Sequence, residues 1–188
     1  MNKTITTQET KTFIGQTGLS AFRSTKNIVF LAVMGAIAIV LGYYTIQIGD
    51  IIKIGFSGIP NQIIASLFGP VVTGIFNGVM DVIKYVIKPT GAFFPGFTIS
   101  AIAGGIIYGI ALWNKKITLP RILITKLIVI EVVDLLMNTL WITMLYGKGF
   151  FAILPMRIVK NVIMWPINSV ILYFVLTRLK GVWKQIIK

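Results

Sequence analysis

The run NIVFLAVMGAIAIVLGYYTI, residues 27–46, contains no charged side chain. An α-helix rises 1.5 Å per residue, so about 20 apolar residues can cross a hydrocarbon layer about 30 Å thick. Arg23 and Lys26 precede the run, and basic residues gather at the cytoplasmic ends of membrane helices. We therefore predict a first transmembrane helix that starts in the cytoplasm.

The rest of the chain has the same apolar character. Of its 188 residues, 56% are hydrophobic and 12% are charged, whereas about 25% of the residues in soluble domains are charged. The mean hydropathy is +0.88. At about 20 residues per crossing, the length allows about six spans and no separate soluble domain. We predict an all-α membrane protein, with about six transmembrane helices over residues 26–182 and cytoplasmic tails at 1–25 and 183–188.

Five further helices are predicted where apolar runs lie between turn signals, at residues 59–68, 71–87, 95–113, 119–146 and 154–179. The run at 59–68 has Pro60 in its first turn, stops at Gly69, and is too short to span a bilayer alone. It is either a re-entrant segment or a short crossing, and a short crossing is favoured because the later loops then obey the orientation rule. Residues 47–58 alternate apolar and polar side chains between glycines, which predicts a hairpin or extended loop outside the membrane.

The chain has eighteen basic and five acidic residues, a formal net charge of +13. The basic residues lie between apolar runs rather than on one soluble face, so anionic lipid headgroups are favoured over nucleic acid as neighbours. Most of them, including Lys126, fall in the predicted cytoplasmic tails and at the cytoplasmic helix ends. Six fall at the outer ends, where the orientation rule predicts few: Lys53, Lys84, Lys88, Lys148, Arg157 and Lys160. This excess predicts a preference for anions at the outer end.

Polar residues at helical spacing form a stripe on each of three predicted helices. Charged groups inside a membrane are costly and usually face the bundle interior or a water-filled cavity. Stripes at similar depth therefore predict one shared cavity near the outer ends. The stripes consist of Asn77, Asp81 and Lys84 on the third helix; Glu131, Asp134, Asn138 and Trp141 on the fifth; and Arg157, Lys160, Asn161 and Trp165 on the sixth.

Each polar group also has a purely structural interpretation. Asp81 and Lys84 lie one turn apart, so pairing within the helix explains them as well as ligand contact does. Structural hydrogen bonding is favoured for Asp134, and an amine that reaches the headgroups is favoured for Lys160 taken alone. Arg157 differs, because a guanidinium with few acids nearby is suited to hold a ligand carboxylate by two parallel hydrogen bonds.

Aromatic residues are frequent near the predicted outer ends, and most of them are expected in the interfacial aromatic belt. A subset that faces inward could stack on a flat heteroaromatic ring while asparagine and aspartate side chains meet its donors and acceptors. The best candidates for stacking are Trp141 and Trp165, which lie on the polar stripes.

Several classes of chemistry are excluded by what the sequence lacks. Cysteine and histidine are absent, and no nucleophile–base pair or GxxxxGK[ST] phosphate loop is evident. We therefore expect no enzyme activity, no metal and no cofactor. Any energy for active transport must come from a partner or from an ion gradient.

Three stretches are similar to those of a known family: Ala32-Val-Met-Gly-Ala36, Lys88-Pro-Thr-Gly-Ala-Phe-Phe-Pro-Gly96 and Arg157-Ile-Val-Lys-Asn161. Together with the six-helix plan, they resemble the substrate-binding components of energy-coupling factor (ECF) transporters of the bacterial plasma membrane, over about residues 25–180. The resemblance implies a subunit that captures a vitamin outside and docks on a transmembrane coupling protein with two ATPase subunits. It also implies that Ala32 and Ala36 face the coupling protein, although small residues four apart otherwise indicate internal packing.

Within that family the chain looks most like the folate-specific component, through the outer loop and residues 155–166. This implies high-affinity binding of folate under a lid formed by loops 47–58 and 88–96. Alternatives are another vitamin such as riboflavin, or a small channel or secondary carrier that works alone; a carrier predicts internal repeats, and none is clear. The implied roles are pterin recognition by Asn77, Asp81 and Asn138, stacking by Phe94, Trp141 and Trp165, and carboxylate binding by Lys84, Arg157 and Lys160.

Overall fold

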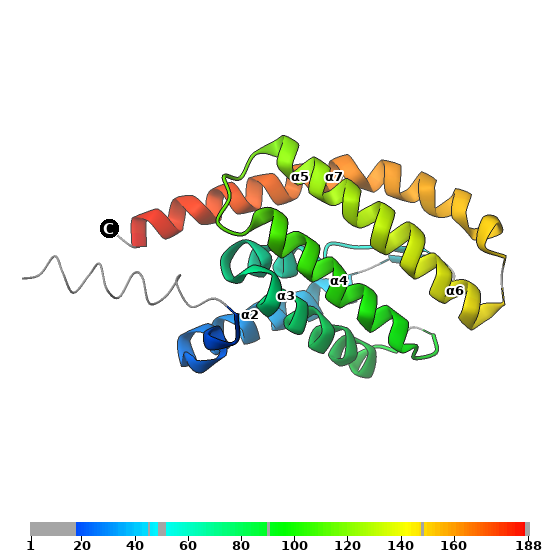
Figure 1. The fold of residues 1–188 in the computed structure, drawn as a ribbon, viewed down its shortest axis with the longest axis horizontal. Coiled ribbons are helices and arrows are strands. Elements are labelled where there is room, and N and C mark those ends of the chain that lie inside the picture. Colours follow the sequence, from blue (N-terminus) through cyan, green and yellow to red (C-terminus); the bar gives the residue numbers. More distant parts are fainter. Residues whose placement is uncertain (1–17, 45, 49–51, 90, 148, 187–188) are drawn as a thin grey trace, which may run out of the picture.

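The computed structural model describes residues 18–44, 46–48, 52–89, 91–147 and 149–186. Figure 1 shows α4, α5, α6 and α7 lengthwise in one bundle, and α2 lies at its edge against α3. The elements are η1 (Gly18–Arg23), α2 (Thr25–Tyr43), β1 (Ile46–Ile48), β2 (Ile52–Ile54), α3 (Ile59–Ile87), α4 (Pro95–Leu112), α5 (Leu119–Val129), η2 (Ile130–Met137), α6 (Asn138–Tyr146) and α7 (Phe150–Ile186).

Five helices of the described chain are long and apolar enough to cross a membrane: α2, α3, α4, the continuous rod α5–η2–α6, and α7 up to residue 179. The predicted helical membrane class is therefore confirmed. The predicted count of about six is slightly off, since five candidate spans are found; the predicted segments 59–68 and 71–87 both lie in α3, on either side of a break at Gly69. The strands β1 and β2 pair antiparallel within the stretch for which a hairpin or an extended loop was predicted.

A break at Gly69 divides α3 into two limbs. Gly69 has φ 81° and ψ −175°, a conformation that favours glycine, and Pro70 lacks the amide hydrogen that would continue the helix. A straight helix of this length would separate its ends by about 43 Å. Instead, Lys84 Nζ in the second limb lies 3.5 Å from the carbonyl oxygen of Ser57, just before the first limb. The chain therefore folds back at Gly69, and the start of the first limb and the end of the second limb lie at the same end of the bundle.

Glycines allow α4 to pack closely against α3. A Cβ atom on Gly105 would lie 2.8 Å from the carbonyl oxygen of Thr73, and one on Gly109 would overlap the backbone of Pro70. The ring of Trp113, which follows α4, lies against Gly69 on the other side of the turn. The fold-back turn is therefore held at the C-terminal end of α4.

The substitution Gly109→Ala is expected to destabilise the protein by about 1–3 kcal/mol, because its methyl group needs space that the Pro70 backbone occupies. Gly104→Ala in the same helix is the matched control, since its Cβ would meet its nearest neighbour, Val133, at 3.9 Å. Thermal unfolding of both variants in detergent measures the difference. Equal melting temperatures would contradict the close packing described for α3 and α4.

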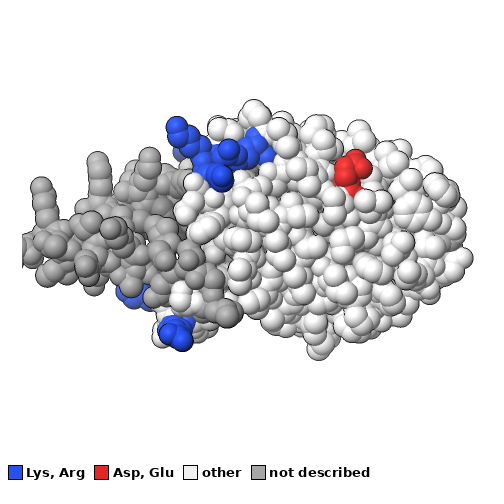
Figure 2. Space-filling view, viewed as in Figure 1, with Lys and Arg blue, Asp and Glu red and all other residues white. Residues whose placement is uncertain are grey.

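The two ends of the bundle differ in charge. Lys115, Lys116 and Arg121 lie around the connection between α4 and α5, and Figure 2 shows Lys and Arg side chains gathered at this end of an otherwise largely uncharged face. The prediction for Lys126 differs from the structure, because this residue lies inside the bundle and is only 9% exposed. Lys126 lies seven residues after Leu119, the first residue of α5, which is about 10 Å along the helix axis. It is therefore deeper in the bundle than the cytoplasmic helix end where the sequence placed it.

Candidate functional site

A cavity of about 470 Å³ lies at the other end of the bundle, beside the β1–β2 hairpin and the connection from α3 to α4. This volume is within the range of about 300–1,000 Å³ that is usual for small-molecule sites. Its wall comes from the end of α2, the second limb of α3, the start of α4, the η2–α6 rod and α7. Six of the predicted site residues line it: Asp81, Lys84, Phe94, Asn138, Arg157 and Lys160.

The α3 wall carries an acid and a base that do not bond to each other. The hydroxyl of Thr98 on α4 donates to Asp81 Oδ2 at 2.8 Å. Lys84 Nζ donates to the carbonyl oxygen of Ser57 at 3.5 Å, although its charge is close enough to interact with that of Asp81. Asp81 and Lys84 therefore interact only through their charges. Each side chain is hydrogen-bonded to a segment outside α3.

Asp134 forms the centre of the deeper wall. Its Oδ1 accepts a hydrogen bond from Asn138 Nδ2 at 3.2 Å. Its backbone carbonyl accepts from Thr139 Oγ1 at 3.3 Å and from Arg157 Nη2 at 3.0 Å, which joins α7 to η2. This segment is a π-helix, and such turns are frequent at functional sites. The Asp134 charge also interacts with those of Arg157 and Lys160.

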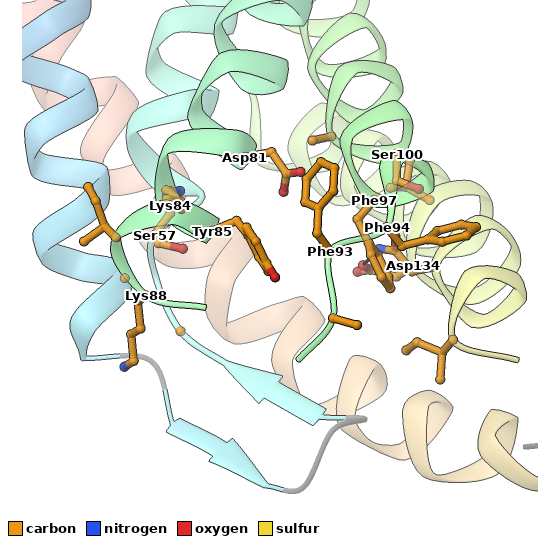
Figure 3. A pocket seen from close by; sticks show the side chains of 18 of the residues that line it. Ser57, Asp81, Lys84, Tyr85, Lys88, Phe93, Phe94, Phe97, Ser100 and Asp134 are labelled. Carbon is orange, nitrogen blue, oxygen red and sulfur yellow. Dashed lines mark hydrogen bonds between the residues drawn. The ribbon is translucent and has the colours of Figure 1, made fainter. Parts of the chain in front are cut away.

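Phenylalanines at the start of α4 form an aromatic wall. Figure 3 shows Phe93, Phe94 and Phe97 together on one side of the cavity, with Lys84, Tyr85, Lys88 and Ser57 grouped on the other. The ring centroid of Phe94 lies 5.6 Å from that of Trp141, and Trp141 Nε1 donates to Ser100 Oγ at 2.9 Å. Trp141 therefore supports the wall from behind Phe94, and the cavity lining does not include it.

The rim of the cavity is held by contacts between α2, α3 and the following connection. Lys88 Nζ donates to the carbonyl oxygen of Tyr43 at 3.4 Å and lies 5.5 Å from the centre of its ring. The hydroxyl of Tyr85 donates to the carbonyl oxygen of Gly91 at 3.4 Å. The tyrosine ring also packs against Phe93, with centroids 5.1 Å apart. These contacts hold aromatic and cationic groups around the opening.

Other predicted residues lie outside the cavity lining. Asn77 is buried, and its Nδ2 donates to the carbonyl oxygen of Ala101 at 3.1 Å. Asn161 is also buried. Trp165 Nε1 donates to the carbonyl oxygen of Leu123 at 3.0 Å, so Trp165 joins α7 to α5. Glu131 is exposed on the outer face of the rod, because residues three apart in a π-helix do not share a face. Of this group, only Asn77 is bonded to a residue of the cavity wall.

Asp134, which belongs to a predicted polar stripe but for which a structural role was favoured, also lines the cavity. The structure adds hydroxyl and aromatic side chains that the sequence does not single out: Ser57, Phe97, Ser100 and Tyr146. Ser57 and Tyr146 come from segments far apart in the chain, so only tertiary packing brings them together. The side chains of Lys53 and Lys148 are outside the described part of the structure.

Ala32 and Ala36 lie on the exposed face of α2. The opposite face of this helix packs inward through Leu31, Gly35 and Ala38. A Cβ atom on Gly35 would lie 3.1 Å from the sulfur of Met80 in α3. Small residues therefore have two effects in α2. Gly35 allows close contact with α3, and Ala32 and Ala36 add little bulk to the exposed face.

Comparison with known proteins gives one consistent result. Residues 26–176 match the family model described as ECF transporter, substrate-specific component. The chain is 37% identical to the folate transporter FolT of Clostridium novyi, over 84% of this chain and 88% of that protein. It is 30% identical to FolT of Leuconostoc mesenteroides, over 82% and 86%. A crystal structure of FolT bound with folic acid superposes with a TM-score of 0.77 and 31% identity, covering 82% of this chain and 95% of that one.

Proposed function

Because this chain belongs to the family of ECF transporter substrate-specific components, we propose that it is the membrane subunit that binds folate for uptake. The observation that carries this proposal is the cavity, in which aromatic rings, two carboxylates and four cations surround a volume suited to a vitamin. Folate combines a flat pterin, which can stack on rings, with a glutamate tail that has two carboxylates. The solved structure of FolT bound with folic acid supports the same ligand.

We place the pterin deep in the cavity and the glutamate tail at its rim. Arg157 lies seven residues from the start of α7, about 10 Å along the helix, and Asp134 lies twelve residues before the end of α6, about 18 Å. Lys84 and Lys88 lie within one turn of the end of α3. Charges are costly to remove from water, so the doubly charged tail is best placed at the rim, beside these two lysines.

The deep end of the cavity offers a matching set of donors and acceptors. A pterin presents two adjacent N–H donors on one edge, and a carboxylate such as Asp134 can accept both. Arg157 beside it can donate to the pterin carbonyl oxygen, which differs from the carboxylate role expected from the sequence. Asp81 and Asn138 line the side walls, and Phe94 provides the stacking surface. Asn77, Trp141, Asn161 and Trp165 then act by holding the walls in place.

The partners follow from the family rather than from contacts in the cavity. We propose that the subunit docks through Ala32 and Ala36 on the transmembrane coupling protein of the ECF module, whose two ATPase subunits supply the energy. The basic end of the bundle then faces the cytoplasm, as the positive-inside rule requires, and the cavity opens outside. We propose that the β1–β2 hairpin and residues 91–94, which lie beside the cavity, form a lid over the ligand.

Titration of the purified chain with folate tests the proposed function directly. We expect saturable binding with a stoichiometry of one, and competition by folate analogues but not by riboflavin or thiamin. A chain that binds riboflavin in preference to folate would keep the family and change the vitamin. No saturable binding of any of the three would contradict the proposal.

A stand-alone secondary carrier is the rival function, and reconstitution separates the two. The chain alone in liposomes should bind folate without accumulating it inside. Addition of the coupling protein and ATPases with ATP should start uptake. Accumulation driven by an ion gradient, without partners, would favour the carrier.

A further inference from the structure

Lys126 is a buried cation that neither the cavity lining nor the membrane surface accounts for. It lies in α5 on the cytoplasmic side of Asp134 and is 9% exposed, inside a bundle whose surroundings are hydrocarbon. Ionisable side chains at such positions are costly and are kept for a function with a definite partner. Asp134 is the acid that lies eight residues further along the same rod, in η2.

The π-helical turn explains how Lys126 and Asp134 share a face. In a regular α-helix, residues eight apart are rotated by about 80° from each other, since each residue advances by about 100°. The segment η2 begins at Ile130, and the wider π-turn advances each residue by a smaller angle. The four steps from Ile130 to Asp134 therefore bring the carboxylate back toward the side that carries Lys126.

Cations lie near Asp134 at two depths of the bundle, in the cavity wall and nearer the basic end. Arg157 and Lys160 line the cavity with it, and Lys126 lies below, outside the lining. Arg157 Nη2 also donates to the backbone carbonyl oxygen of Asp134, whereas Lys126 lies eight residues before Asp134 on the same rod. The cations of the cavity wall are also the groups that a bound ligand needs. A cation that is outside the cavity can balance the carboxylate without competing for the ligand.

We propose that Lys126 is a positioning residue for ligand binding: it balances the charge of Asp134 from beneath the cavity and keeps that carboxylate directed to the N–H donors of a pterin-like ring. Without Lys126, the carboxylate turns toward Arg157 and Lys160 and is lost as an acceptor. The ligand class is a ring with two adjacent N–H donors, which rests on the proposed folate function.

A double-mutant cycle on the full chain tests whether Lys126 acts through Asp134. Lys126→Met keeps the length of the side chain and removes its charge, and Lys126→Arg keeps the charge. The matched control is Lys116→Met, an exposed lysine before α5. Folate affinity is measured by titration for each variant, for Asp134→Asn and for the double variant, together with the melting temperature.

We expect Lys126→Met to weaken folate binding about tenfold, with Lys126→Arg and Lys116→Met within about twofold of the natural chain. In the Asp134→Asn background, Lys126→Met should have no further effect. The same tenfold loss in both backgrounds, or no loss in the natural one, would overturn the proposal. A natural chain that does not bind folate overturns the proposed function and this inference together, whereas a natural chain that binds folate with an inert Lys126→Met overturns the inference alone.

Discussion

Replacement of Arg157 by alanine is expected to weaken folate binding between about 30-fold and 1,000-fold. Loss of one partner from a buried, charge-assisted hydrogen bond costs about 2–4 kcal/mol, and each 1.4 kcal/mol is a tenfold change in affinity. Arg157 is 6% exposed and also donates to the backbone of Asp134, so its removal affects both the ligand and the wall. Titration of the purified variant measures the loss.

Two comparisons show which part of folate Arg157 contacts. In folate diamide, both glutamate carboxylates are carboxamides. If Arg157 contacts the pterin, the Arg157→Ala variant should lose as much affinity for folate diamide as for folate. If only folate loses affinity, Arg157 holds a carboxylate, as expected from the sequence. Arg121→Ala, outside the cavity, is the control and should bind folate normally. Undiminished folate affinity in Arg157→Ala would remove this residue from the site.

Replacement of both Ala32 and Ala36 by leucine is expected to reduce folate uptake at least tenfold and to leave folate binding unchanged. Both alanines are on the exposed face of α2, away from the cavity lining. Larger side chains there prevent the close approach that small residues allow between membrane helices. Uptake into liposomes that contain the whole transporter, and titration of the isolated subunit, measure the two effects.

Val162→Leu is the matched control, because Val162 is exposed on α7 rather than on α2 and is 63% accessible. It adds a methylene group on the lipid-facing side and should leave uptake intact. Equal uptake by the control and the double variant would show that the alanine strip is not the docking surface. Loss of folate binding in the double variant would instead indicate a disturbed fold.

The helices could be predicted from the sequence because the membrane imposes a strong rule on composition. Apolar runs bounded by glycine, proline and charge coincide with α2, α4 and the rod that ends at Tyr146 within a few residues. The break at Gly69 was also predicted; what the sequence did not show is that the two limbs of α3 fold back on each other there. Sequence signals mark where a helix breaks, and only packing decides how the limbs are arranged.

The candidate site was only partly predictable, and the reason is geometric. Asp81, Lys84 and Arg157 all line the cavity, because each lies on the inward face of a regular helix. Helical spacing fails for Glu131, because the π-turn changes the angle between successive residues. It also fails for Trp165, whose indole is used to join two helices. Contacts between distant segments, such as that of Lys88 with Tyr43, carry no periodic signal.

The fold-back at Gly69 also bears on how the protein enters the membrane during synthesis. The first limb of α3 has about ten residues, about 15 Å of helix, which covers only half of the hydrocarbon layer. Such a segment cannot remain inserted alone. It needs the second limb and the glycine face of α4 before its turn is covered, so residues 59–112 have to integrate as one unit.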